Sequence, residues 1–246
     1  MTPVDNPDRS GSALVDDELD PARYDGQTDH PQEVAGALRA LMPQGVRVLD
    51  VGCATGSVTL IVNRGKNNEV IGVEPDPQRA AIARARGVEV ISDAFDKDLL
   101  ERLEPFDVIV FADVLEHLPD PAEVLGLASS ALKPGGVILA SVPNVAHWTV
   151  RVNLLLGRFN YRPTGIMDST HLRWFTARTF EELFHRKNME VLASTQTAGV
   201  ELPVYASRFR WLPRAVVHRM VRALARAFPR LFGCQHVVKA RPRATP

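Results

Sequence analysis

Cysteine is scarce in this chain, and long apolar runs are absent. The 246-residue sequence has only Cys53 and Cys234, too few for a fold stapled by disulfides. It shows no basic-then-apolar leader and no apolar run near the ~18 residues that a bilayer-spanning helix needs. We therefore expect a protein of a reducing, cytoplasmic compartment. The 45% apolar content suffices for one large α/β core.

Net charge is also lacking, but the zero total conceals a strong asymmetry. Residues 1–30 hold eight acids and two arginines, whereas residues 202–246 hold ten Lys or Arg and no acid. The first ~25 residues have too few apolar groups to offset the entropy of ordering. We expect an acidic, mobile tail over residues 1–30, which could fold over a site, followed by one domain over residues 31–246.

A strand, a glycine loop and a distant acid stand at the spacing of a nucleotide-cofactor site. Residues 48–56 read VLDVGCATG and residues 70–74 read VIGVE. Small residues in the loop let backbone approach a ligand, and an acid about 20 residues further on can hold a ribose diol. Ala54 and Ser57 stand where a pyrophosphate-binding loop has glycine. We therefore expect a cofactor without a pyrophosphate, and interpret Cys53 as a small packing residue.

Three further motifs follow in order. Residues 93–95 read DAF, residues 106–118 read FDVIVFADVLEHL, and residues 132–136 read LKPGG. With the glycine loop they resemble the family of Rossmann-like methyltransferases that use S-adenosylmethionine, over roughly residues 31–200. The resemblance implies a mostly parallel seven-stranded sheet with helices on both faces.

The same resemblance implies the cofactor site. Asp50 and the loop backbone would face the methionine end, Glu74 the ribose hydroxyls, and Asp93 with Ala94 the adenine. Ala54 replaces the usual middle glycine, which we expect to require a negative φ. The full implied set is Asp50, Gly52, Ala54, Gly56, Glu74, Pro75, Asp93, Ala94 and Ala112.

Apolar periodicity agrees with this fold. The spacing of apolar residues after Pro31 predicts a helix before the first strand, and Thr176 is expected to cap a helix that runs to Lys187. Strands are predicted near 46–51, 69–74, 88–92, 106–111, 136–142, 190–197 and 235–240, separated by helical segments.

A candidate metal site follows the fourth predicted strand. Residues 113–117 read DVLEH and come directly after that strand. Ligands bind beyond the carboxyl ends of parallel strands, so this segment would lie at the ligand site. The predicted ligands of Mg²⁺ or Mn²⁺ are Asp113, Glu116, His117 and His171. The pattern resembles the metal site of methyltransferases that act on the terminal ribose diol of small RNAs. Many metal-free family members share the Glu-His pair, where it orients substrate or packs.

Methyl transfer is an in-line displacement that needs an aligned acceptor and removal of its proton. A sugar hydroxyl is a poor nucleophile at neutral pH, so it needs a base or a bound cation. His117, His147 and His171 are the candidate bases. Each could instead be a hydrogen-bonded structural histidine.

The segment from residue 142 to 176 carries the prediction of the acceptor. It resembles methyltransferases encoded with polysaccharide and glycoconjugate enzymes. The frequent arginine and alanine of the chain would suit a methylated mannoside as the acceptor. Aromatic side chains could stack on sugar faces and polar ones could bond hydroxyls. The predicted substrate residues are Asn144, Trp148, Tyr161, Asp168 and Arg173. Phe159 and Trp174 fit a core role equally well.

Residues 203–232 form a predicted basic helical insertion before the last strand. Val217, Val221, Leu224 and Phe228 share one helical stripe, while four arginines make another. The stripe could pack on the domain, form a homodimer contact or a lid, or meet an anionic surface. Membrane-surface contact is conceivable because Trp211 and Phe232 flank it.

Together these patterns favour a metal-assisted O-methyltransferase for a saccharide hydroxyl. We expect no stable nucleic-acid complex, although RNA ribose methylation is the nearest enzymatic alternative, with another small-molecule acceptor also open. A scaffold that binds the cofactor without catalysis is the alternative from another class.

Overall fold

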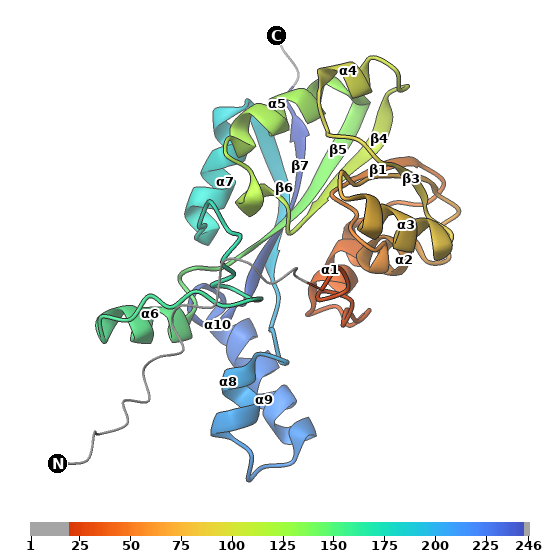
Figure 1. Ribbon diagram of the computed structural model, residues 1–246. Coiled ribbons are helices and arrows are strands. Elements are labelled where there is room, and N and C mark those ends of the chain that lie inside the picture. Colours follow the sequence, from red (N-terminus) through yellow and green to blue (C-terminus); the bar gives the residue numbers. More distant parts are fainter. Residues whose placement is uncertain (1–19, 244–246) are drawn as a thin grey trace, which may run out of the picture.

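A computed structural model describes residues 20–243 of the chain (Figure 1). Its strands are β1 (Arg47–Val51), β2 (Glu69–Val73), β3 (Glu89–Ile91), β4 (Phe106–Ala112), β5 (Leu132–Pro143), β6 (Met189–Gln196) and β7 (Gln235–Pro242). Its helices are α1 (Val34–Leu41), α2 (Ser57–Asn63), α3 (Pro77–Ala85), α4 (Lys97–Leu100), η1 (Leu115–His117), α5 (Pro121–Ser130), α6 (Trp148–Leu155), α7 (Ala177–Arg186), α8 (Pro203–Arg208), α9 (Arg214–Ala227) and α10 (Pro229–Phe232).

All seven strands form one sheet in the order β3-β2-β1-β4-β5-β7-β6. The first five strands pair in parallel, whereas β7 runs antiparallel to both β5 and β6. The predicted fold class and the seven predicted strands are therefore confirmed. The order reverses next to β1, so the ends of β1 and β4 open onto the crevice where such sheets bind ligands.

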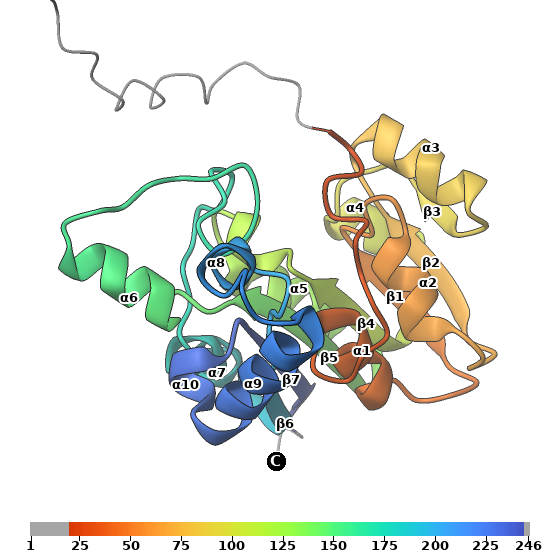
Figure 2. The same cartoon turned by 90° about the horizontal axis from the view of Figure 1, so that it is seen from below.

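Helices cover both faces of the sheet (Figure 2). Strand residues alternate between the faces, so Val48 and Val108 pack with α1 and α2, while Leu49 and Ile109 pack toward α5 and α7. Burial of strand residues on both sides explains why they read as nearly continuous apolar runs.

Several helices begin at residues that the sequence marks as caps. Asp76, Asp96 and Asp120 accept backbone N–H bonds at the starts of α3, α4 and α5. Thr176 caps α7 through a reciprocal bond with Thr179, as predicted. These caps fix where each helix leaves the edge of the sheet that carries the loops.

The basic insertion is helical and projects beyond that edge as α8, α9 and α10 (Figure 1). Val217 and Val221 of α9 pack with Tyr205 of α8, so much of the predicted stripe is internal. Phe228 departs from it, because the helix ends at Ala227 and leaves this side chain 58% exposed. Within residues 20–243, no helix has both the length and the apolar character to span a bilayer.

Residues 20–30, which were expected to belong to a mobile tail, are packed against the domain. Residues 1–19 lie outside the described part of the chain. Residues 20–30 run along the loop-bearing edge, where the backbone of His30 packs against Gly36 of α1 so closely that no Cβ would fit. This short segment therefore belongs to the folded domain.

Candidate active site

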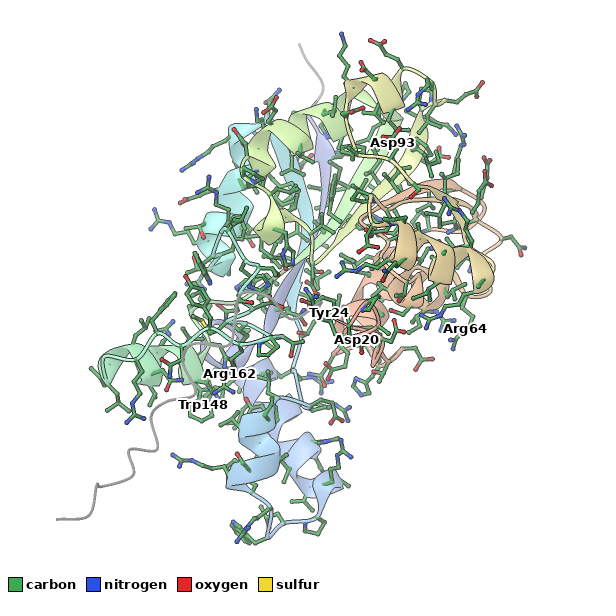
Figure 3. All side chains as sticks on the ribbon, viewed as in Figure 1. Asp20, Tyr24, Arg64, Asp93, Trp148 and Arg162 are labelled. Atoms are coloured by element: carbon green, nitrogen blue, oxygen red, sulfur yellow. The ribbon has the colours of Figure 1, made fainter. Side chains whose placement is uncertain are left out.

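A cavity of about 1860 Å³ opens at the carboxyl ends of β1, β2 and β4. Its walls come from the glycine loop, η1, α6, the loop before α7 and residues 21–27. Typical ligand pockets measure roughly 300–1,000 Å³, so this one has room for a cofactor and an acceptor together. The labels of Tyr24 and Asp20 in Figure 3 mark the end of the sheet at which this cavity opens.

The glycine loop lines one wall of the cavity. Gly52 has φ 69° and lies against Val114, leaving no space for a Cβ. Ala54 has φ 48°, so the expectation of a negative φ was wrong. Its N–H donates to Glu74 Oε2 over 2.9 Å, and this bond holds the left-handed turn that alanine itself disfavours.

Two buried carboxylates stand behind this loop. Glu74 also accepts an N–H bond from Asp76 over 2.9 Å, so it is fixed from both sides. Asp50 accepts a bond from the Thr59 hydroxyl over 2.6 Å, and burial raises its pKa to about 6. The pair forms an acidic floor beneath the loop.

Most of the predicted cofactor residues line the cavity, and two do not. Those on its walls are Asp50, Gly52, Ala54, Glu74, Pro75, Ala94 and Ala112. Gly56 instead packs against Ala83 and Val88 at the start of α2. Asp93 points away and pairs with Arg102 over 2.8 Å, beside α4 and far from Tyr24 (Figure 3).

Of the four predicted metal ligands, Asp113 lies apart from the other three. It adopts φ 55° after β4, and its carboxylate accepts bonds from Ser141 over 2.7 Å and Gln235 over 2.5 Å. Burial raises its pKa to about 6. The prediction of Asp113 as a ligand was wrong because these partners draw its carboxylate toward β5 and β7.

The other three predicted ligands do come together. One atom from each of Glu116, His117 and His171 lies within 4.8 Å of the others, and the two imidazole rings are 4.8 Å apart. The Glu116 carbonyl accepts the backbone N–H groups of Leu172 and Arg173, each over 2.9 Å. These bonds clamp the loop that carries His171 onto η1.

Both histidines line the cavity, and within residues 20–243 one ring nitrogen of each forms no hydrogen bond. His117 Nδ1 bonds the Thr170 carbonyl over 3.1 Å, and His171 Nδ1 bonds the Ile166 carbonyl over 3.2 Å. Since a carbonyl only accepts, Nδ1 carries the proton and Nε2 keeps a lone pair. Burial lowers the pKa of both imidazoles, to about 4 for His171, so both are neutral at pH 7.

Glu116 is the unusual member of this cluster. Its side chain is 1% exposed, and within residues 20–243 neither carboxylate oxygen has a hydrogen-bond partner. Burial, with nearby Asp113, raises its pKa well above the usual range. A buried carboxylate without a partner is costly, which indicates a missing cationic or hydrogen-donating ligand.

Three residues predicted to contact the acceptor are structural instead. The Asn144 side chain bonds the Gly233 carbonyl over 2.8 Å, and His147 caps α6 while contacting Thr149 and Tyr205. Trp148 donates to Tyr205 and packs among the insertion helices. His147 is fully buried off the cavity with a pKa lowered by burial to about 4, so its assignment as the base was wrong.

The remaining predicted acceptor residues also lie off the cavity wall. Exposed Tyr161 packs with exposed Phe159 and half-buried Trp174 in one aromatic group outside the cavity. Arg173 bonds the Pro119 carbonyl, and buried Asp168 bonds Thr170 and Tyr24. The expected sugar-stacking surface is therefore not part of this cavity.

Sequence reasoning allowed the segment before α1 to fold over a site, but it did not identify the residues that anchor the segment there. Tyr24 donates to Asp168, while Asp25 accepts from Thr55 and pairs with Arg86 over 2.6 Å. Burial and the bond to Asp168 raise the pKa of Tyr24 to about 12. The only signal was one aromatic residue among the acids, which composition alone does not distinguish from a tail.

The fold and cavity define the class of Rossmann-like S-adenosylmethionine-dependent methyltransferases. Residues 25–194 match the family model described as Methyltransferase domain, and the chain belongs to that family.

Relatives and solved structures agree with this class. The ubiquinone biosynthesis O-methyltransferase of Hahella chejuensis is 32% identical over 58% of this chain and 65% of its own length. That of Bradyrhizobium sp. is 28% identical over 73% and 71%. The chain spans less than two thirds of the length of the Hahella chejuensis relative and of the matching Xylella fastidiosa relative.

A Geobacter sulfurreducens methyltransferase bound to S-adenosyl-L-homocysteine superposes with a TM-score of 0.54 at 18% identity, over 85% of this chain and 90% of its own. A Mesorhizobium loti S-adenosylmethionine-dependent methyltransferase gives 0.53 at 18% identity, over 84% and 96%. At this identity, these two likenesses concern the fold.

Proposed function

We propose that the protein transfers a methyl group from S-adenosylmethionine to an acceptor hydroxyl held beside Glu116, His117 and His171. The observation that carries this proposal is the buried Glu116 carboxylate, which has no hydrogen-bond partner in the described part of the chain, next to two neutral imidazoles in the cavity. The curated relatives are named as O-methyltransferases, which supports oxygen as the methylated atom.

The glycine-loop wall suits the cofactor. Glu74 uses its oxygens to hold the N–H groups of Ala54 and Asp76, and each oxygen retains a lone pair for a ribose hydroxyl. Ala94 and Ala112 lie further along the wall and leave space for a flat ring. The loop fixes the cofactor, so the reacting methyl group and the acceptor can be held in line.

A divalent cation fits the three-residue cluster. Two imidazole Nε2 atoms and one carboxylate are a common donor set, and the carbonyls bonded to Nδ1 fix both rings. Without Asp113, nitrogen donors outnumber oxygen donors, which favours Mn²⁺ over Mg²⁺. When bound there, the cation would lower the pKa of the acceptor hydroxyl.

The acceptor class is the finer part of this proposal. A saccharide is the acceptor expected from sequence, although Trp148, Tyr161 and Trp174 do not line the cavity. The names of the relatives point to a hydroxyl of a compound in ubiquinone biosynthesis. Both acceptors supply a hydroxyl that the cluster can orient, and one assay separates them.

That assay follows labelled methyl from S-adenosylmethionine into saccharides, catechols and short RNAs, with EDTA, Mg²⁺ or Mn²⁺. We expect label in a saccharide or a catechol, lost in EDTA and restored best by Mn²⁺. Label in RNA alone would assign ribose methylation instead. Cofactor binding with no label in any acceptor would favour the scaffold alternative.

Variants test the cluster itself. His171→Ala and Glu116→Gln should each lower turnover by about 10²-fold or more and abolish Mn²⁺ binding measured by calorimetry. His185→Ala is the control, because His185 is exposed on α7 away from the cavity. Full activity of Glu116→Gln in EDTA would remove the cation from the mechanism.

A further inference from the structure

Helix α6 and the loop after it stand out from the rest of the fold. Every residue from 151 to 165 is exposed. In Figures 1 and 2 this segment projects sideways from the body of the molecule, away from the sheet. Such isolation is unusual for a segment so rich in large apolar side chains.

The apolar side chains of this segment have little cover within the described chain. Leu155 is 86% exposed and Leu156 is 60% exposed, on a surface where single exposed apolar residues are common but contiguous ones are not. The other large apolar members are Val152 at 45%, Leu154 at 50%, Phe159 at 43% and Tyr161 at 44%. A run of this kind indicates a partner that supplies apolar contact.

The charge of the segment identifies the chemistry of that partner. Arg151, Arg158 and Arg162 are its charged residues, and no acid occurs between Glu123 and Asp168. None of the three arginines forms an ion pair within residues 20–243. The partner therefore combines an apolar interior with negative charge.

We propose that residues 151–162 dock on an anionic lipid bilayer. The leucines enter the boundary between headgroups and acyl chains, and the arginines meet lipid phosphates. A second copy of the chain fits less well, because a two-fold contact would set these arginines against their own copies without an acid between them. The basic helix α9 is a weaker candidate, since Val217 and Val221 are already buried in the insertion.

Docking through residues 151–162 would also bring the cavity close to the bilayer. Thr149, Val150 and Asn153 of α6 line it, as does the loop from Arg162 to Met167. Helix α6 thus contributes both to the wall of the cavity and to the run of exposed leucines. A docked protein holds its cavity mouth next to the bilayer surface.

Cosedimentation of the full chain with vesicles tests this proposal. We expect binding to vesicles of phosphatidylcholine mixed with phosphatidylglycerol, and much less to phosphatidylcholine alone. The double variant Leu155→Glu with Leu156→Glu should lose on the order of tenfold or more in binding. Changing the three arginines together to Gln should remove the preference for phosphatidylglycerol.

Leu60→Glu is the matched control, because Leu60 is a half-exposed helical leucine on α2. It should bind vesicles like the parent chain, and circular dichroism should show all variants folded. Equal vesicle binding by the double variant and the parent would overturn the proposal. So would a dimer or an RNA complex of the parent chain, without vesicle binding, that the double variant loses.

Discussion

The Tyr24 hydroxyl donates a hydrogen bond to the Asp168 carboxylate, joining residues 144 positions apart in the chain. Asp168 also accepts the N–H of Thr170, next to His171, over 2.8 Å. Asp25 fastens the same segment to Thr55 and Arg86 on the cofactor side. The segment before α1 therefore spans the cavity and couples both of its walls.

Tyr24→Phe should loosen that segment. Loss of a hydrogen bond to a charged group is worth roughly 1.5–3 kcal/mol, which corresponds to about tenfold or more in local opening. Hydrogen–deuterium exchange of residues 20–30 should accelerate accordingly. Tyr161→Phe is the control, because that ring is exposed and off the cavity. Unchanged exchange in Tyr24→Phe would show that Asp25 and Gly36 alone hold the segment.

Ala54→Gly should raise stability, against the usual effect of this substitution. Ala54 pays a left-handed strain of about 1–2 kcal/mol, which exceeds the added chain entropy of glycine, so we expect a gain of about 0.5 kcal/mol. Ala81→Gly, on the exposed side of α3, should lose about 0.5–1 kcal/mol. Urea denaturation of both variants measures the contrast, and losses in both would contradict it.

Glu74→Gln should weaken cofactor binding. The variant keeps the size of the side chain but removes the charge that accepts ribose hydroxyls, so the Kd for S-adenosylhomocysteine should rise about tenfold to a hundredfold. Glu69→Gln is the control on the same strand, at its exposed end beside Arg47. Calorimetry that returned the parent Kd for Glu74→Gln would move the ribose contact elsewhere.

His236 makes the fold sensitive to acid. It is 1% exposed, both ring nitrogens lack partners within residues 20–243, and burial lowers its pKa from 6.5 to about 4. The unfolded chain therefore takes up the proton first, and stability falls as pH drops from about 6.5 toward 4, by roughly 3 kcal/mol.

His236→Leu should remove this loss and raise the Tm at pH 5 more than at pH 8. Thermal melts of parent and variant at both pH values measure the difference. A parallel shift of the two melts would assign the acid sensitivity to another group.

Local patterns in the sequence predicted the sheet well. Apolar runs ending in glycine, Asp or Glu mark strands and their ends through near-neighbour effects, as at Asp50 and Glu74. The Glu116 and His117 pair was found for the same reason, because both follow β4 directly. His171 was found through the resemblance to a metal site in which one later histidine joins the Glu-His pair.

The errors arose where distant segments decide the environment. Asn144 and His147 follow a strand as acceptor residues would, yet Gly233 and Tyr205, both from the far end of the chain, bury and bond them. Asp113 is drawn away by Gln235 in the same manner. Periodicity carries no information about such partners.

The antiparallel course of β7 has a consequence for the insertion. Thr197 and residues 234–235 exchange backbone bonds of 2.9 and 3.0 Å, so the chain leaves and re-enters the sheet at one point. Residues 198–233 therefore form a segment whose two ends are bonded to each other. Its length can change without changing the distance between β6 and β7. A transplanted segment from a relative would meet the same three anchoring residues, and it would also have to supply the contacts that Tyr205 and Gly233 make with His147 and Asn144.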